Sequence, residues 1–460
     1  MNGDHGGAVV EGIRSELHHL DSRDRREAAR IGGTMGQPGV AARGEEEGEP
    51  VTESEATTVE PILVGVRVLD FTQYVAGPTV TRLMAALGAY VIKVEPAPAG
   101  DLMRRLAWII DGRSSAYVQQ NRGKRSLAVN LDTKEGCDLL RRLVPHVDVV
   151  AENFGPDVME KRGLGYPDLA ALNPRVIMAS VSAFGRVGPL AHRVGYDTIA
   201  QAYSGLMHMT GDPDGAPVNT GIAVADTTTG LNCFGALGYA LYHRERTGRG
   251  QHIDIAMVDT MFQNHESGLS AYAASKGTYV PLRSGRHHPL LCPCGVFRGP
   301  KGWIVLIVTD NQWPGLCRAM GHPELEHDQR FDDTPKRTAN QVELIGIIEA
   351  WMASQPDDDA VIAAFSEHRI PGERIRSPVD ALTDPHYLAR GMIDVIHDAV
   401  LGELKLPGVP LRFSESPVLQ GRGAPTLGEH NQEVLGGILG LSAAEVDKLT
   451  AAGVLAQNDR

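Results

Sequence analysis

The feature that most constrains this chain is a regular alternation of short apolar runs and amphipathic stretches that begins near residue 62. Residues 66–72 (VRVLDFT) and 90–95 (YVIKVE) have the length and β-branched content of buried strands. Between them, residues 78–88 (PTVTRLMAALG) predict a helix that opens with proline and closes with glycine. A strand, a helix and a strand in this order predict a parallel βαβ unit.

The alternation continues along the next ninety residues. Further strands are predicted at 125–131, 147–153 and 175–184, with a helix over 134–146 and two short helices near 156–163 and 167–173. This order predicts a mostly parallel sheet with helices on both faces. Ligands of open α/β sheets bind beyond the carboxyl ends of the strands, where the segments 72–78, 152–156 and 182–189 lie.

A nicotinamide site is disfavoured by the first strand-to-helix turn. Glu95, at the end of the second strand, matches the acidic part of the dinucleotide fingerprint. The turn TQYVAGP (72–78), however, has one glycine where G-x-G-x-x-G is required. The phosphate cradle of a dinucleotide is therefore missing.

The pattern changes in the second half of the chain. Residues 251–262 predict a strand that leads into a helix. Residues 294–308 (CGVFRGPKGWIVLIV) predict a β-hairpin with its turn at 299–302, followed by helices near 312–320 and 341–353. We expect a separate, smaller domain at 286–384. After it come strands near 392–399 and 403–413 and a terminal pair of helices.

The first 60 residues differ from the rest in composition. They hold 13 acidic and 6 basic side chains and show no sustained apolar period. Such a segment cannot bury enough apolar surface to order itself, so residues 1–60 are predicted to be a disordered acidic tail. The segment is too acidic for a transit peptide and lacks the apolar core of a secretory signal.

Charge, cysteine content and hydropathy exclude several classes of protein. The net charge of −13 argues against nucleic acid as a partner. The five cysteines are too few and odd in number for a secreted disulfide framework, and the CPC triplet at 292–294 has no second ligand pair at zinc-like spacing, so no metal site is expected. No apolar run reaches the length of a membrane span, and a cytoplasmic location is expected.

Asp226 stands alone among small and β-branched residues in GIAVADTTTG (221–230), at the start of a predicted helix that runs to about Arg246. Two interpretations are open at this point. An acid in the first turn can cap free backbone N–H groups and interact with the positive end of the helix dipole. A carboxylate that a helix N-terminus keeps ionised, with small neighbours, is also an accessible oxygen nucleophile.

Ordered motifs between about Leu63 and Val454 resemble the class III (family III) CoA-transferases, a family that also includes α-methylacyl-CoA racemases. The motifs are VRVLDFTQYVAGPTVTRLMAALGAYVIKVEP (66–96), NRGKRSLAVNL (121–131), DVVAENFGPDVMEKRGLGY (148–166), NPRVIMASVSAFG (173–185), GYDTIAQAYSGLMHMTG (195–211), VADTTTG (224–230), HRERTGRGQHIDIAM (243–257) and PTLGEHN (425–431). The resemblance implies an α/β fold with a Rossmann-like, mostly parallel sheet built from both ends of the chain, a smaller α+β domain, and a homodimer of two interlocked subunits. The domains expected on this basis are a large CoA-binding domain at 61–258 and 400–460, linkers at 259–285 and 385–399, and the small domain at 286–384.

The family's catalytic aspartate falls on Asp226. The resemblance therefore implies an acyl-CoA:carboxylate CoA-transferase in which this carboxylate attacks the thioester to give a mixed anhydride, and the released CoA thiolate then converts the anhydride into an aspartyl-CoA thioester. CoA and acyl-CoA are expected as substrates, together with a carboxylic acid, and no tightly bound cofactor or metal is implied. Thioester and anhydride carbonyls are already electrophilic, so the protein mainly positions the groups and excludes water.

The resemblance also places eight residues along CoA: Gln73, Val75, Ala76, Asn153, Phe154, Gly155, Lys161 and Tyr196. An aromatic ring at Phe154 can face the adenine or the pantetheine arm, and Lys161 can offset phosphate charge. Lys124 and Arg125 are weaker candidates for phosphate contacts. Pro96 stands where some relatives have a basic residue.

Two other functions are considered. The first is an α-methylacyl-CoA racemase, but racemases of this family tend to carry histidine where this chain has Tyr196, and a tyrosine hydroxyl is poorly suited to take a proton near neutral pH. The second, a CoA-binding protein without turnover, is disfavoured because Asp226 is retained. The transferase is therefore the favoured function.

Overall fold

The computed structural model describes residues 59–458. The predicted acidic tail, residues 1–60, falls outside the described residues except for its last two positions. No helix in the described range is long and apolar enough to cross a membrane.

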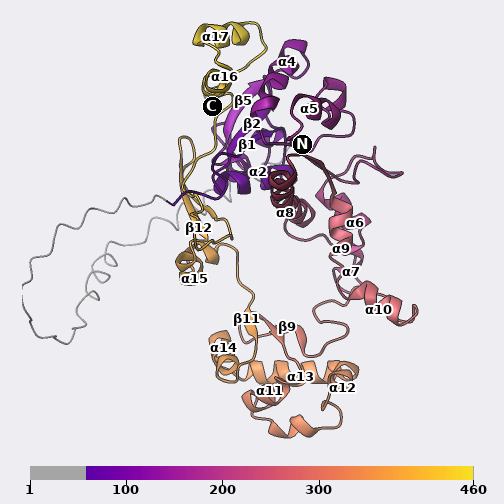
Figure 1. The fold of residues 1–460 in the computed structure, drawn as a ribbon. Helices are drawn as coiled ribbons and strands as arrows, with labels where there is room; N and C mark the ends of the chain where they lie inside the picture. The colour runs from indigo at the N-terminus through magenta and orange to yellow at the C-terminus, as the bar shows by residue number, and fades with distance from the viewer. Residues whose placement is uncertain (1–58, 459–460) are drawn as a thin grey trace, which may run out of the picture. The chain divides into compact units, whose positions relative to one another are not determined.

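A six-stranded parallel sheet forms the centre of the large domain (Figure 1), and it confirms the predicted sheet. Its strands, listed across the sheet, are β5 (Arg125–Val129), β2 (Tyr90–Pro96), β1 (Arg67–Asp70), β6 (Val149–Glu152), β7 (Ile177–Ser182) and β8 (His252–Ala256). Counted along the chain, this is the order 3-2-1-4-5-6 of Rossmann-type folds. The order reverses between β1 and β6, and ligands of such folds bind at this switch point.

Two apolar layers cover the sheet because alternate side chains of each strand point to opposite faces. On β1, Val68 belongs to the layer beneath α2 (Ala76–Ala86) and α8 (Val224–Thr247), whereas Leu69 belongs to the layer beneath α4 (Lys134–Leu143) and α16 (Asn431–Leu439). Every buried residue of both layers is an aliphatic side chain, a methionine, a cysteine or a phenylalanine. Burial of these layers supplies the main driving force for the fold.

The C-terminal segment completes the edge of the sheet beside β5. The Asn431 side chain accepts a hydrogen bond from the backbone N–H of Ala128 at 3.0 Å, and Leu455 forms a bridge with Val129. Figure 1 shows α16 beside β5. Residues from both ends of the described chain therefore pack on one sheet.

The predicted hairpin in the second half is confirmed. Strand β9 (Cys294–Arg298) pairs antiparallel with β10 (Trp303–Ile307), and β11 (Gly372–Arg374) joins the other side of β10. This sheet shares a separate apolar cluster with α11 (Trp313–Ala319), α13 (Gln341–Ala353) and α14 (Asp358–Glu367). A core of its own is what a separate domain requires.

A further hairpin pairs β12 (Ile393–Asp398) with β13 (Gly402–Pro407). The boundary predicted between residues 399 and 400 falls in its turn, and both stretches predicted as linkers contain helices. The domain boundaries themselves stay predictions. The other described elements are β3 Ile109–Ile110, β4 Arg113–Ser114, α3 Ser115–Asn121, α5 Tyr166–Leu172, α6 Asp197–Tyr203, α7 Leu206–Met209, α9 Met257–Gln263, α10 Gly268–Ala274, α12 Thr334–Ala339, α15 Pro385–Ala389 and α17 Ala443–Ala451.

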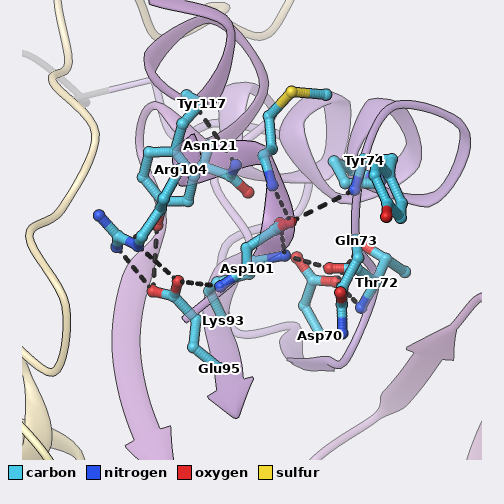
Figure 2. A network of polar contacts seen from close by, with 12 residues as sticks. Asp70, Thr72, Gln73, Tyr74, Lys93, Glu95, Asp101, Arg104, Tyr117 and Asn121 are labelled. Atoms are coloured by element: carbon cyan, nitrogen blue, oxygen red, sulfur yellow. Dashed lines mark hydrogen bonds and ion pairs between the residues drawn. The ribbon is translucent and has the colours of Figure 1, made fainter. Parts of the chain in front are cut away.

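A buried ionic network lies at the carboxyl end of β1 and β2 (Figure 2). Asp70, the last residue of β1, pairs with Lys124 at 2.9 Å and accepts hydrogen bonds from the hydroxyl groups of Thr72 and Thr81. Beside it, Lys93 pairs with Asp101 at 2.8 Å. All four charged side chains are fully buried.

The charges of this network compensate one another. Burial opposes ionisation of Asp70, but the ammonium groups of Lys124 and Lys93 outweigh it and hold the pKa of this carboxyl below its usual range. Burial lowers the pKa of Lys124 to about 8, against the opposing effect of Asp70. Loss of one partner would leave the other charge buried and unpaired, which is more costly than loss of an exposed pair.

We predict that Asp70→Asn lowers the free energy of unfolding by about 3 to 5 kcal/mol, because Lys124 then loses its carboxylate partner inside the protein. Urea titration followed by circular dichroism measures this change. Asp138→Asn is the matched control, since its pair with Lys134 lies exposed on α4, and the denaturation midpoint should stay where it is. Equal losses in the two variants would show that burial does not decide the cost.

Candidate active site

A cleft of about 420 Å³ opens beyond the carboxyl ends of β1, β6 and β7. Seven of the nine residues predicted for the site line it: Gln73, Ala76, Asn153, Phe154, Gly155, Tyr196 and Asp226. They come from four separate segments of the chain. The topological switch point therefore coincides with the place where the predicted residues meet.

A reciprocal pair of hydrogen bonds joins the loops that follow β1 and β6. The backbone N–H of Gln73 donates to Oδ1 of Asn153 at 2.7 Å, and Nδ2 of Asn153 donates to the carbonyl of Gln73 at 2.7 Å. Asn153 is thereby fixed by main-chain atoms of the neighbouring loop. The second N–H of the amide and the other lone pair of Oδ1 remain available to a ligand in the cleft.

Tyr74 occupies an uncommon backbone conformation at the cleft, with φ of 64°. Its backbone N–H points to Oδ1 of Asp101 at 3.4 Å, and Figure 2 shows this contact beside the buried network. Its ring meets the ring of Tyr196 edge to face, with centroids 5.7 Å apart. Tyr74 was not predicted as a site residue. The one feature of the sequence that pointed to it was its position in the loop after β1.

Two predicted CoA contacts do not line the cleft. Val75 caps α2 through its carbonyl, which accepts hydrogen bonds from the backbone and hydroxyl of Thr79. Lys161 lies exposed near the end of a short turn of helix and lines a separate surface hollow with Asp132 and Arg162. Contacts of these two residues with CoA stay predictions.

The prediction that Lys124 contacts a phosphate of CoA is wrong. Its ammonium is buried and bound to Asp70, so it cannot reach a phosphate. Arg125 is partly exposed, pairs with Glu433 at 2.7 Å and stacks on the ring of Tyr90. Lys124 of the NRGKRS motif therefore pairs with an acid inside the protein.

Glu95 is likewise engaged inside the protein. Its carboxylate is fully buried and accepts hydrogen bonds from Arg104, at 2.7 Å, and from the hydroxyl of Ser126, at 2.6 Å. A ribose hydroxyl could not reach it. This agrees with the missing glycine fingerprint of a dinucleotide site.

A second buried carboxylate, Glu152 at the end of β6, links two loops of the cleft. It accepts the backbone N–H of Phe154 at 2.8 Å and pairs with the guanidinium of Arg186. The backbone N–H of Arg186 also donates to Asp254 at 2.9 Å. These contacts hold the start of the loop that carries His192, Arg193 and Tyr196 toward the cleft, and they were not predicted from the sequence.

Asp226 lies in the first turn of α8, as predicted, but it does not cap the helix. The cap is Asp197, whose Oδ1 accepts the backbone N–H of Ala225 at 2.7 Å and of Asp226 at 3.3 Å. Its other oxygen accepts Nε2 of Gln201 at 2.7 Å. The prediction that Asp226 caps α8 is wrong, because Asp197 already occupies the free donors of the first turn.

The carboxylate of Asp226 is left without a hydrogen-bond donor or a cation among residues 59–458. Burial, and secondarily the charge of Asp197, raise the pKa of Asp226 to about 7. This raised pKa differs from the expectation that the helix N-terminus keeps the group ionised. Near neutral pH, Asp226 exchanges between its two protonation states.

Close packing of α2 on α8 brings Ala76 and Asp226 to one cleft. Gly230 makes this possible, because a Cβ atom at that position would lie 2.7 Å from the carbonyl oxygen of Ala76. The glycine of VADTTTG thus has a packing role. Within the described part of the chain, no group of three or more His, Cys, Asp or Glu side chains could hold a metal ion.

We predict that Asp226→Asn stabilises the protein at pH 8 but not at pH 4. The folded-state pKa of about 7 lies above the ordinary value of 3.8, so ionisation costs the folded state free energy as pH rises through this window, and the cost is complete above it. Asparagine cannot ionise. The gain at pH 8 should be on the order of a few kcal/mol, at about 1.4 kcal/mol for each pKa unit.

Thermal unfolding of both proteins across pH 4 to 8 measures this difference. Asp168→Asn, an exposed acid in the first turn of α5, is the control and should show no such pH-dependent gain. A difference between wild type and Asp226→Asn that does not grow with pH would contradict the raised pKa.

Comparisons with known proteins find similar CoA-transferases and a similar solved structure. Two curated relatives are the succinyl-CoA–D-citramalate CoA-transferase of Chloroflexus aurantiacus, 37% identical over 85% of this chain and 97% of the relative, and the succinate–glutarate CoA-transferase of Agrobacterium fabrum, 39% identical over 82% and 95%. A CAIB/BAIF family protein from Brucella suis has a similar solved structure, with a TM-score of 0.72 and 35% identity over 82% of this chain and 100% of that one.

The model of CoA-transferase family III matches residues 63–431. This match covers most of the chain and confirms the resemblance identified from the motifs. Together with the relatives, it establishes that the chain belongs to CoA-transferase family III and is an enzyme that transfers coenzyme A.

Proposed function

We propose that Asp226 is the nucleophile of an acyl-CoA:carboxylate CoA-transfer that takes place in the cleft between β1, β6 and α8. The observation that carries this proposal is that its carboxylate faces the cleft and accepts no hydrogen bond from the described residues, while Asp197 satisfies the helix terminus. A carboxylate that caps a helix is engaged through its oxygens. One that is released from this task can attack a carbonyl carbon.

The reaction proceeds in balanced steps. An Oδ atom of Asp226 attacks the thioester carbonyl, so that a C–O bond forms and the C–S bond breaks. CoA leaves as a thiolate, and an aspartyl–acyl mixed anhydride remains on the protein. The thiolate then attacks the aspartyl carbonyl, which forms the aspartyl-CoA thioester and releases the acyl group as a carboxylate. An acceptor carboxylate reverses both steps and leaves with CoA, while Asp226 is restored.

The environment of Asp226 suits this sequence of steps. Only the ionised form attacks, and a pKa of about 7 leaves a substantial ionised fraction at neutral pH. The partial burial of Asp226 limits the water that can solvate the nucleophile or reach the anhydride. The two protein charges near the site, on Asp226 and Asp197, also favour conversion of the carboxylate into a neutral ester-like group.

CoA is proposed to lie along the loops after β1 and β6. Gln73, Ala76, Asn153, Phe154 and Gly155 line the cleft on that side. Gly155 has no atom within 4 Å of where a Cβ would lie, so a pantetheine arm could pass close to the backbone there. Tyr196 is 56% exposed at the cleft and can donate its hydroxyl hydrogen to a substrate.

The substrates are proposed to be dicarboxylic acids and their CoA thioesters. The relatives named above act on succinyl-CoA with citramalate and on succinate with glutarate. In this chain, His192 and Arg193 line the same cleft as Asp226. Arg193 lies over the ring of Phe184, with no carboxylate partner among the described residues, so it can receive the second carboxylate of such an acid.

A homodimer is also proposed. Large apolar side chains stand exposed along α8 and α9: Leu231, Tyr239, Tyr242 and Phe262. Leu231 and Tyr239 also line a groove between α8, β8 and α9. Exposed apolar side chains on neighbouring helices are typical of an interface, and two interlocked subunits would cover them. The cytoplasmic location stays a prediction.

We predict that Asp226→Asn reduces CoA-transfer from succinyl-CoA to glutarate by at least about a thousandfold, because an amide is a far weaker nucleophile and the whole covalent route depends on it. In the wild type, incubation with succinyl-CoA should add a hydroxylamine-labile CoA adduct to the peptide that contains Asp226, visible by mass spectrometry. Asp168→Asn should keep both activity and adduct. Full activity of Asp226→Asn, once deamidation is excluded, would refute the assignment.

We predict that the protein elutes as a dimer at twice the 49.4 kDa mass of the chain, because the exposed apolar faces of α8 and α9 are then covered. Size-exclusion chromatography with light scattering measures the mass. A monomer that retains full transferase activity would rule out a required dimer.

A further inference from the structure

A second, much smaller cavity lies between α2 and the segment that follows the β12–β13 hairpin. Its volume is about 20 Å³, enough for a single species of roughly the size of water. Three arginines and one acid contribute to its wall: Arg82, Arg122, Arg422 and Asp394. None of these residues lines the catalytic cleft. We call it the arginine cavity.

Arg82 is the unusual member of this wall. Its Nε and Nη1 atoms are buried, and neither has a hydrogen-bond partner among residues 59–458. Buried polar atoms in folded proteins are almost always paired, and a charged donor without a partner is the costliest exception. Burial, and then the charge of Arg122, lower the pKa of Arg82 to about 10, which leaves the guanidinium charged at neutral pH.

The acid in the cavity wall compensates Arg82 only in part. Asp394 favours the charged form of Arg82 but forms no hydrogen bond with it in the described part of the chain. Oδ2 of Asp394 pairs with Nε of Arg122 at 3.4 Å, and Oδ1 accepts the backbone N–H of Gly421 at 2.7 Å. Arg122 is fully engaged as well, since its two Nη atoms donate to Gln119 and to the carbonyl of Pro407. The pair Arg122–Asp394 is complete without Arg82.

Arg422 adds a third positive charge. Its side chain is exposed, lines the cavity, and has no hydrogen bond or ion pair in the described part of the chain. The wall thus carries three cations and one anion. A water molecule could accept hydrogen bonds from Arg82, but it would leave this excess of positive charge uncompensated.

We propose that the arginine cavity binds one small inorganic anion of the size and charge of chloride. Such an ion would accept hydrogen bonds from the buried Nε and Nη1 of Arg82 and would reduce the repulsion among the three guanidinium groups. A volume of about 20 Å³ suits a single-atom ion better than the larger phosphate or sulfate. The inference concerns a site separate from the proposed catalysis and does not depend on the role of Asp226.

The site would connect two distant parts of the chain. Arg82 belongs to α2, whose first turn lines the catalytic cleft. Asp394 belongs to β12 and Arg422 to the segment after the β12–β13 hairpin, and both are part of the C-terminal segment of the chain, taken here as residues 393–458. An anion that binds only the folded arrangement stabilises it in proportion to its concentration relative to the dissociation constant. Chloride would therefore strengthen the attachment of the C-terminal segment to α2.

The test is a chloride titration of the full-length protein at constant ionic strength, with gluconate as the replacing anion and thermal unfolding as the readout. The unfolding temperature of the wild type should rise with chloride and then saturate. Arg82→Met, which keeps the length of the side chain and removes its charge, should lose this saturable rise and should be at least as stable as wild type in gluconate. Arg175→Met, an exposed arginine paired with Glu245 elsewhere, should respond as wild type does.

A direct measurement keeps the proposal testable if a variant is unstable. Crystals grown in bromide should show an anomalous-scattering peak between Arg82 and Arg422 in the wild type. Equal unfolding temperatures in chloride and gluconate, with an ordered water molecule at that position, would overturn the proposal. A bromide peak without any stabilisation by chloride would show an adventitious ion only and would also overturn it.

Discussion

The carboxylate of Asp70 is the contact on which the geometry of the cleft depends. It stands at the end of the central strand β1, where the chain must turn sharply into α2, and it accepts hydrogen bonds from Thr72 and Thr81 on both sides of that turn. The ammonium group of Lys124 offsets the electrostatic cost of burying the Asp70 carboxylate. The turn is thereby rigid before any substrate binds, and the Gln73–Asn153 hydrogen bonds extend this rigidity across the switch point to β6.

Asp197 and Asp226 divide between them two tasks that a single acid could not perform together. An acid that caps a helix engages its oxygens in hydrogen bonds from backbone N–H groups. Asp197 takes that position, and its charge together with burial leaves Asp226 with a pKa of about 7. Ionisation of Asp226 therefore destabilises the folded protein above neutral pH. Strain of this kind is expected at functional sites.

The parallel sheet and the hairpin of the second half were predictable from the sequence because their signals are local. Apolar runs such as 90–95, and the turn residues at 299–302, determine strands and turns within a few residues. The position of Asp226 in the first turn of α8 was predictable for the same reason. Its cap was not, because Asp197 lies 29 residues earlier and reaches the helix only through the fold. The phosphate contact predicted for Lys124 was wrong for a related reason. A basic motif indicates surface charge, and only the packed structure reveals that Asp70 lies buried opposite Lys124.

Several acids around the cleft fix the loops and the helix that line it. Asp70 fixes the loop after β1, Glu152 fixes the loops that carry Phe154 and Arg186, and Asp197 fixes the start of α8. The oxygens of these acids bind main-chain N–H groups, hydroxyl or amide side chains, or a cation within the protein. The carboxylate of Asp226 faces the same cleft without such a partner among residues 59–458. The mixed anhydride proposed above would react with any misplaced water, so the positions of the surrounding loops have to be set before the acyl group arrives. Acids bound to the backbone around the cleft can do this without competing for the substrate.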